Sequence, residues 1–368
     1  MLASACRKRA AARDAPEEFP LAVLRARLKT KIAAKTERVE APQPPAGTFD
    51  KIFYDAPLGK NVAYVSPVKE GTERPAIVWI AGGMDWGIEA DSWQDAPRSN
   101  DQSARAFREG GGIVLMRPSL RGSNKNPGKN ECFLGEVDDV LAAADYLAER
   151  PDVNSKRIYL GGHSTGGTMV LLIVASTDRF RAAFAFGPVA DARQYGGDGC
   201  MPIDISDTEA APRAPIDFLK DVRTPTWVIE GSKGGTSGLF PRLKKAKEDA
   251  PIEFVLIKKA THFNTLAPTT EDIAAQILDD TDAARTFSST PRASPSVSPR
   301  TKNSGRRDLA RLPSELPRRA RALASAFKSR LRWFGSQRAD RGDRGRAEHE
   351  RAEFGELVRR GAPAIARA

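Results

Sequence analysis

Short apolar runs alternate with one-faced helical stretches from residue 51 to residue 284, and this alternation restricts the fold more than any other feature of the sequence. Runs such as Ala76–Ile80 and Arg157–Gly161 have the length and near-continuous hydrophobicity of strands buried on both faces. Glu136–Glu149 carries apolar residues at helical spacing and predicts an amphipathic helix. Because strands separated by helices imply crossover connections, we expect a mostly parallel sheet with helices on both faces.

The same criteria predict the remaining elements of this region. We expect further strands over residues 51–55, 62–65, 112–116, 181–186, 225–230 and 252–257, and further helices over 101–110, 165–176, 214–221, 240–249 and 270–278. The longest apolar runs are far shorter than the ~20 residues that a membrane-spanning helix needs. An integral membrane protein is therefore not expected.

The formal net charge of +11 is unevenly distributed along the chain. Residues 285–368 hold 21 Lys and Arg against 8 Asp and Glu, residues 1–50 hold 10 against 6, and the region between them holds 27 against 33. We therefore expect a basic N-terminal extension (1–50), one α/β domain (51–284) and a disordered Ser/Pro/Arg-rich tail (285–368) with a candidate amphipathic helix over 314–334. The tail is a candidate for weak contact with polyanions or anionic membranes, while the mildly acidic middle predicts no specific nucleic-acid partner.

Three cysteines, Cys6, Cys132 and Cys200, are too few and too scattered to predict a disulfide framework or a zinc site. We expect Cys132 and Cys200 to be buried or neutral thiols, and no metal site is predicted. No apolar stretch near Met1 has the length of a secretory signal, so the expected location is cytoplasmic.

A Gly-x-Ser-x-Gly motif, Gly162-His163-Ser164-Thr165-Gly166, follows the expected strand Arg157–Gly161 and precedes an apolar helix. This is the strand–turn–helix context in which a nucleophilic serine stands on a sharp, strained turn between residues with almost no side chain. The helix after the turn directs free N–H groups and a partial positive charge to the same point. The motif therefore predicts Ser164 as a nucleophile.

A serine hydroxyl needs a base, and only three histidines can supply one. The side chain of His163 should point away from the hydroxyl of its neighbour Ser164 and pack or hydrogen bond beneath the turn. His349 lies in the basic tail. His262 follows the last expected strand, where the base of such a sheet belongs, and is the predicted base.

Two N–H donors are needed to stabilise the oxyanion that forms during acyl transfer. The backbone N–H of Thr165, directly after the nucleophile, is one candidate. The loop after Ala76–Ile80 supplies the second through Gly82 or Gly83, because glycine lets a backbone N–H approach closely.

At these residues the chain resembles the α/β-hydrolase superfamily, and more narrowly the catalytic domain of the prolyl oligopeptidase (S9-type) peptidases and the related esterases and dienelactone hydrolases. The resemblance also rests on residues 117–123, 136–147, 206–231 and 260–262, and it covers about two thirds of the chain. It implies an α/β-hydrolase fold with about eight strands, an acyl-serine intermediate and no cofactor. About 50 residues precede this region and the segment between residues 186 and 225 is short, so we expect no gating propeller and a small or absent cap.

The acid of the catalytic triad departs from the family pattern. The family usually places an Asp three residues after the glycine that ends the seventh strand, and here Gly234 stands three residues beyond Gly231. Glu230 at the end of that strand and Asp191 after the preceding strand are both candidate substitutes.

The function predicted from the sequence is that of a serine hydrolase cleaving a small ester or a short peptide through an acyl-serine intermediate. Two alternatives stay open. The displaced acid is compatible with a catalytically impaired binding module, and the basic tail is compatible with a polyanion- or membrane-associated protein.

Overall fold

The computed structural model describes residues 19–34, 39–196, 200–202 and 204–281. The chain divides into two units, Met1–Ser298 and Pro299–Ala368, and every described residue belongs to the first. The expected amphipathic helix at 314–334, the rest of the basic tail and His349 therefore lie outside the described residues.

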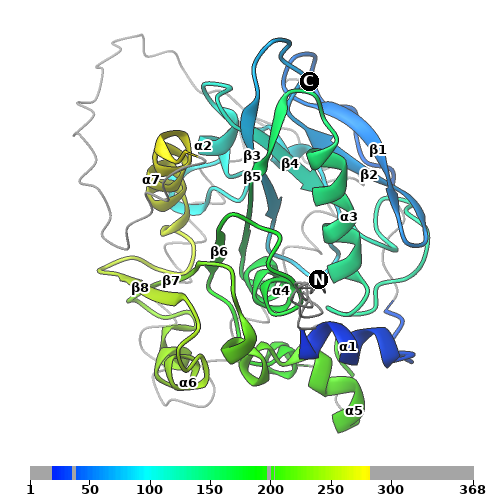
Figure 1. The fold of residues 1–368 in the computed structure, drawn as a ribbon, viewed down its shortest axis with the longest axis vertical. Coiled ribbons are helices and arrows are strands. Elements are labelled where there is room, and N and C mark those ends of the chain that lie inside the picture. Colours follow the sequence, from blue (N-terminus) through cyan, green and yellow to red (C-terminus); the bar gives the residue numbers. More distant parts are fainter. Residues whose placement is uncertain (1–18, 35–38, 197–199, 203, 282–368) are drawn as a thin grey trace, which may run out of the picture. The chain divides into compact units, whose positions relative to one another are not determined.

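Eight strands form one sheet in the order β1-β2-β4-β3-β5-β6-β7-β8 (Figure 1). β1 and β2 form an antiparallel hairpin, β2 runs antiparallel to β4, and all other pairs are parallel. The prediction of a mostly parallel, eight-stranded α/β-hydrolase sheet is confirmed. The strands are β1 (Asp50–Ala56), β2 (Gly59–Val65), β3 (Arg74–Ile80), β4 (Val114–Pro118), β5 (Val153–His163), β6 (Ala183–Phe186), β7 (Thr226–Gly231) and β8 (Ile252–Ile257).

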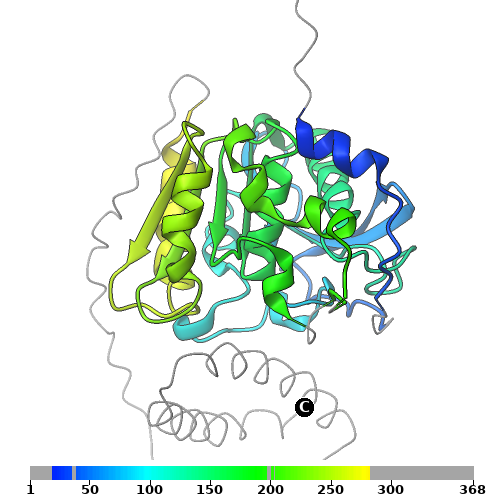
Figure 2. The same cartoon turned by 90° about the horizontal axis from the view of Figure 1, so that it is seen from below.

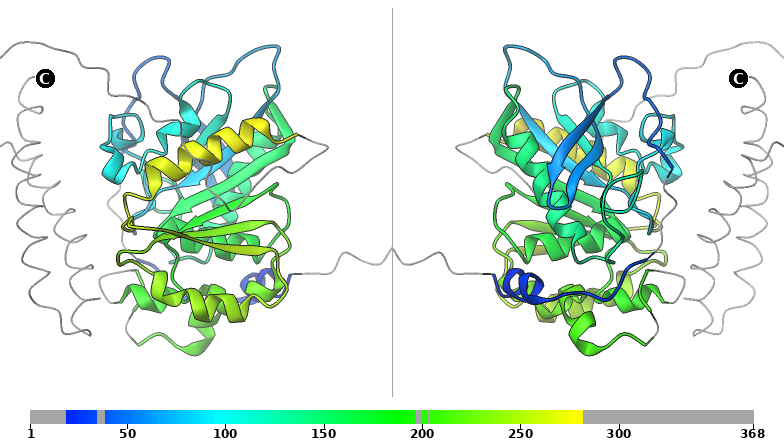
Figure 3. Two further views of the ribbon diagram at one scale, coloured as in Figure 1. Left: turned by 90° about the vertical axis from the view of Figure 1, so that its left-hand side faces the viewer. Right: turned by 90° about the vertical axis from the view of Figure 1, so that its right-hand side faces the viewer.

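Helices cover both faces of this sheet (Figure 3). α2 (Arg105–Arg108) and α7 (Leu266–Asp279) pack on one face, where Phe107, Ile273 and Ile277 join a core with Trp79 and Tyr159. α3 (Glu136–Ala148) and α4 (Thr165–Val174) cover the opposite face, and α6 (Phe240–Ala246) precedes β8. Every residue of α4 is buried, which explains its almost uniformly apolar sequence.

The prediction of an α-helix over residues 214–221 is wrong. This segment forms two short 3₁₀ turns, Pro215–Asp217 and Leu219–Asp221. A proline at residue 215 fits the first turn of a helix but cannot continue one, since it has no backbone N–H.

Part of the N-terminal stretch packs onto the domain. α1 (Pro20–Arg27) buries Leu21 completely, and its Arg25 donates to Asp138 Oδ1 at 2.6 Å and to the carbonyl of Leu134 at 3.0 Å. α1 lies beside the segment that holds α5 (Asp207–Ala210), as Figure 2 shows from below. No helix is predicted here from the sequence, because the apolar residues Leu21–Leu24 form one short continuous run without helical spacing.

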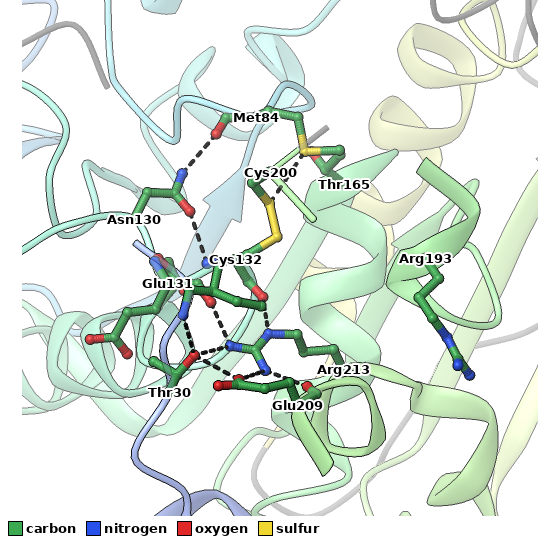
Figure 4. Close-up of a disulfide and its surroundings, with 12 residues drawn as sticks. Thr30, Met84, Asn130, Glu131, Cys132, Thr165, Arg193, Cys200, Glu209 and Arg213 are labelled. Carbon is green, nitrogen blue, oxygen red and sulfur yellow. Dashed lines mark hydrogen bonds and ion pairs between the residues drawn. A yellow bond between two sulfur atoms is a disulfide. The ribbon is translucent and has the colours of Figure 1, made fainter. Parts of the chain in front are cut away.

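Cys132 and Cys200 form a disulfide, with their Cα atoms 5.5 Å apart (Figure 4). The expectation of free thiols is therefore wrong. Two cysteines that are 68 residues apart in the sequence carry no pairing signal, and only the fold brings them within bridging distance. Among the described residues, no helix is both long enough and apolar enough to cross a bilayer.

Candidate active site

Ser164 stands on the turn between β5 and α4, with backbone angles φ 58° and ψ −114°. A non-glycine residue in this conformation costs roughly 1–3 kcal/mol and persists only where its surroundings hold it. Here the N–H of Ser164 donates to the carbonyl of Phe186 at 2.7 Å. A Cβ at Gly166 would collide with the backbone of Ile80, so the motif's second glycine lets α4 start directly against β3. The structure thus contains the strained turn that the motif predicts.

His262 lies in the loop between β8 and α7, and its Nδ1 is 2.8 Å from Oε2 of Glu230 at the end of β7. Both side chains are buried, with His262 5% and Glu230 1% exposed. Oε1 of Glu230 also accepts from the N–H of Gly231 at 2.7 Å, and Oε2 accepts from the N–H and the hydroxyl of Thr236 at 3.0 Å each. Each of these partners is a hydrogen-bond donor to the carboxylate.

This environment fixes the charge of Glu230. Burial by itself raises the pKa of the carboxyl, but the hydrogen bond and charge of His262 and the N–H groups of Thr236 and Gly231 outweigh it. The pKa of Glu230 is therefore lowered, and the group is an anion at neutral pH. An anion facing Nδ1 holds a proton there, which leaves Nε2 of a neutral His262 as the basic nitrogen.

Asp191, the other candidate for the acid, has different partners. It caps the 3₁₀ turn Ala192–Tyr195 by accepting from the N–H of Arg193 at 2.8 Å, and it pairs with the Arg193 guanidinium at 2.6 Å. The carboxylate at the imidazole therefore belongs to Glu230. Its longer side chain reaches His262 from the strand end itself, so no Asp is needed further along the loop.

The end of β6 links the serine turn to the Glu230–His262 pair. Phe186 accepts the hydrogen bond from Ser164, and the next residue, Gly187, has φ +57°. A Cβ at Gly187 would lie 2.6 Å from Nδ1 of His262 and 2.9 Å from Oε2 of Glu230. Glycine is thus required where the chain passes between the turn and the imidazole.

His163 packs beneath the turn, as its position before Ser164 predicts. It is 1% exposed, and burial lowers its pKa well below the usual value, so it is neutral. Its Nε2 lies 3.0 Å from the carbonyl of His262, which can only accept, so Nε2 carries the proton. Nδ1 then accepts from the Gln102 amide at 3.0 Å. His163 therefore fastens the His262 loop to the turn, and Gln102 is a residue that no sequence signal identified.

The loop after β3 lies directly beside Ser164. A Cβ at Gly82 would be 3.3 Å from the Ser164 Cβ. The N–H of Gly83 donates to the hydroxyl of Thr165 at 3.0 Å, and that hydroxyl donates to the carbonyl of Gly83 at 2.5 Å. Since the Gly83 N–H is engaged in this way, the oxyanion donors compatible with the structure are the backbone N–H groups of Gly82 and Thr165. Thr165 adds the dipole of α4, whose first residue it is.

Two arginines near this loop have different surroundings. Arg121 is bound to Asp139 at 2.8 Å and to Glu131 at 3.1 Å, which makes it a structural ion pair. Arg117 is 2% exposed, donates to the carbonyl of Gln102 at 3.2 Å, and lines a small cavity together with Gly82. Burial lowers the pKa of Arg117, although a guanidinium remains charged at any physiological pH.

The fold is that of an α/β-hydrolase. Residues 102–231 match the model of the prolyl oligopeptidase family. Among curated proteins, the chain is 31% identical over 138 residues to the uncharacterized peptidase YuxL of Bacillus subtilis (strain 168), covering 32% of this chain and 21% of YuxL. It is 30% identical over 139 residues to the uncharacterized peptidase YtmA of the same strain, covering 33% of this chain and 52% of YtmA.

Solved structures agree on the fold. A puromycin-hydrolysing peptidase of Mycobacterium tuberculosis is 21% identical with a TM-score of 0.50, covering 64% of this chain and 41% of that one. The 2,6-dihydroxy-pseudo-oxynicotine hydrolase is 15% identical with a TM-score of 0.50, covering 68% of this chain and 73% of that one.

The chain has the α/β-hydrolase fold, and its segment from Gln102 to Gly231, about a third of its length, is similar to the prolyl oligopeptidase family. It spans about a fifth and about half of the length of the two curated relatives. The matched segment contains the serine turn and the candidate acid, while His262 lies beyond it.

Proposed function

We propose that the protein is a serine hydrolase that cleaves a small ester or a short peptide through an acyl-serine intermediate. The observation that carries this proposal is the buried Glu230–His262 hydrogen bond of 2.8 Å, held by Gly187 and Phe186 against the strained turn of Ser164. A nucleophile, a base and a group that orients the base are the minimum set for acyl transfer by a serine.

In the first step, the hydroxyl oxygen of Ser164 attacks the substrate carbonyl carbon while Nε2 of His262 takes the hydroxyl proton. The resulting imidazolium lies next to the anionic Glu230, which stabilises its charge. The N–H groups of Gly82 and Thr165 donate to the oxyanion of the tetrahedral intermediate. Collapse of this intermediate breaks the bond to the leaving group, which receives the proton from His262.

In the second step, water attacks the acyl-serine with His262 again acting as base. The proton then returns to the oxygen of Ser164, and the acid product leaves. The same two donors stabilise the second oxyanion, so one set of groups serves both halves of the reaction.

The substrate class follows from the relatives. The matched family and both curated relatives are peptidases by name, which favours a peptide or an aminoacyl derivative as substrate. Esters remain in the proposal because a serine that attacks an amide also attacks the more reactive ester.

Turnover of a small panel tests the proposal. The panel contains p-nitrophenyl esters of short acids and p-nitroanilides of single amino acids and dipeptides. We expect the wild-type protein to hydrolyse at least one of them and Ser164→Ala to lose the activity. Equal rates for the wild type and Ser164→Ala, or no turnover of any member, would contradict it.

Two proposals concern the chain's ends and its location. Weak contact of residues 285–368 with polyanions or anionic membranes is supported by the net charge of that stretch, where basic residues outnumber acidic ones 21 to 8. A cytoplasmic location stays a proposal as well. The Cys132–Cys200 disulfide weighs against it, since such bonds persist mainly in oxidising compartments.

A further inference from the structure

The Cys132–Cys200 disulfide lies against the loop that carries the oxyanion donor (Figure 4). Sγ of Cys200 is 4.0 Å from Sδ of Met84, two residues after Gly82. Cys132 is fully buried and Cys200 is partly exposed, so the bond has one protected end and one accessible end. The bridge therefore contacts the side chain of Met84, a residue of the loop on which oxyanion stabilisation depends.

Asn130 connects the other end of the bridge to the same loop. Its amide Nδ2 donates to the carbonyl of Met84 at 2.8 Å, and its Oδ1 accepts from the N–H of Cys132 at 2.9 Å. Asn130 is 1% exposed, and its hydrogen bond with Cys132 is buried while that with Met84 is partly buried. Met84 therefore has two links to the disulfide. Its side chain contacts Cys200, and its carbonyl is connected to Cys132 through Asn130.

The turn that contains Cys132 is strained. Cys132 and the next residue, Phe133, have φ values of +60° and +68°, a region that costs side chains other than glycine roughly 1 kcal/mol each. The Phe133 ring is fully buried and packs edge-on against Trp86, with ring centroids 5.1 Å apart. Trp86 is itself strained, with φ +52°, and lies two residues after Met84. The strained turn and the oxyanion loop therefore hold each other in place.

One end of this assembly is anchored independently of the bridge. The fully buried Arg213 donates through Nε to the carbonyl of Cys132 at 2.7 Å and through Nη2 to the carbonyl of Glu131 at 2.8 Å. Its Nη1 also pairs with Glu209 at 3.0 Å. These contacts do not involve the sulfur atoms. Breaking the disulfide therefore releases Cys200 and leaves the backbone of Cys132 anchored by Arg213.

We propose that the disulfide positions the oxyanion loop, so that its reduction lowers turnover without altering the nucleophile, the base or the acid. This proposal rests on the proposed hydrolase function. The reductant is a dithiol, one of whose thiolates attacks Sγ of the accessible Cys200 and displaces the Cys132 thiolate. Its second thiol resolves the mixed disulfide. The protein gains two electrons and two protons as two thiols, and the dithiol becomes a disulfide.

The kinetic test compares the oxidised protein with the protein reduced by dithiothreitol and then with the reoxidised protein. Losing one oxyanion donor lowers kcat by about 10²–10³ where this has been measured, so a loosened loop should lower it by at least about tenfold. KM should change little, since the loop acts on the developing oxyanion, and reoxidation should restore kcat. Unchanged kcat in fully reduced protein would overturn the proposal.

Cysteine variants distinguish loss of the Cys132–Cys200 disulfide from other effects of the reductant on the protein. Cys200→Ser should have the low kcat of the reduced protein and should not respond to dithiothreitol. Cys6→Ser, the matched control, should behave as the wild type in both redox states. A Cys200→Ser protein with full activity would contradict the positioning role.

A readout independent of activity distinguishes this inference from the proposed function. Amide hydrogen exchange of a peptide spanning residues 81–86 should speed up on reduction, while a peptide from β7 should stay unchanged. If amide hydrogen exchange of residues 81–86 were equal in the two redox states, the positioning role of the disulfide would be contradicted even if the enzyme is active. Faster exchange at 81–86 in a protein with no hydrolase activity would uphold the loop contact and reject the proposed function alone.

Discussion

Replacement of Glu230 by Gln is the perturbation whose effect can be worked out most fully from the structure. The carboxylate faces four donors: the N–H of Gly231, the N–H and hydroxyl of Thr236, and Nδ1 of His262. A carboxamide has only one oxygen. In either orientation its NH₂ group meets at least one of these donors, and the negative charge is lost.

The magnitude follows from the charge next to the imidazolium. Two unit charges about 4 Å apart attract by about 4 kcal/mol at an effective dielectric constant of about 20. Each 1.36 kcal/mol of barrier is tenfold in rate, so Glu230→Gln should lower kcat by roughly 10³. KM should be nearly unchanged, because Glu230 is buried behind His262 and acts only through it.

The assay is steady-state hydrolysis of the best substrate from the panel, with folding checked by far-ultraviolet circular dichroism. Asp191→Asn is the matched control, since it also removes one carboxylate, which here pairs with the half-exposed Arg193. That control should keep its kcat within about twofold, as expected of a substitution outside the catalytic groups. A folded Glu230→Gln protein retaining more than a tenth of the wild-type kcat, or an equal loss in Asp191→Asn, would refute the reasoning.

Three further predictions concern stability and the tail. Burial raises the pKa of Glu136 from 4.5 to about 7, so the folded state favours the protonated carboxyl. The contribution of Glu136 to the free energy of unfolding is therefore fully present below pH 4.5 and is lost as the pH rises through 7. Glu136→Gln should therefore remove a decline of about 3 kcal/mol in the free energy of unfolding between pH 4 and pH 8, measured by urea denaturation. Burial opposes ionisation of Asp152, but Arg150 and Arg74 outweigh it and lower its pKa to about 2 from 3.8, so its contribution is present above pH 3.8 and lost as the pH falls through 2. Asp152→Asn should cost about 2 kcal/mol at pH 7, and an unchanged urea midpoint would contradict this. Removal of residues 285–368 should leave kcat within about twofold but abolish salt-sensitive retention on heparin, whereas retention by the shortened chain would exclude the tail as its source.

The strands were predictable because a parallel sheet buries both faces of its strands, so each appears in the sequence as a short apolar run. β3 and β4, buried at every position, are the clearest cases. The serine turn was predictable for a related reason, since few residue types tolerate its backbone and its close approach to β3. The 3₁₀ turns after residue 214 were not, because proline placement outweighs helical spacing there.

The acid was only partly predictable. Glu230 lies at the end of β7 and Asp191 in the loop after β6, and the sequence does not show which carboxylate is free to turn toward the imidazole. The structure distinguishes the two carboxylates. Asp191 forms an ion pair with Arg193, whereas Glu230 accepts a hydrogen bond from the N–H of Thr236 and faces the imidazole. Such choices depend on loop conformation, which local sequence patterns do not encode.

The disulfide and the packing of α1 escaped prediction for one common reason. Both depend on contacts between distant parts of the chain, such as Cys132 with Cys200 and Arg25 with Asp138. No periodicity links residues separated by 68 or 113 positions. Gln102 was missed in the same way, since its role at the site comes from its contact with the distant His163.

Covalent labelling by a fluorophosphonate tests the central claim most directly, because the reagent reacts with a serine only where a base and oxyanion donors activate it. After labelling and proteolysis, mass spectrometry should find the phosphonyl group on Ser164 in the wild type and find no label in Ser164→Ala or His262→Ala. An unlabelled wild-type protein in its oxidised state, or a label on another serine, would contradict the account.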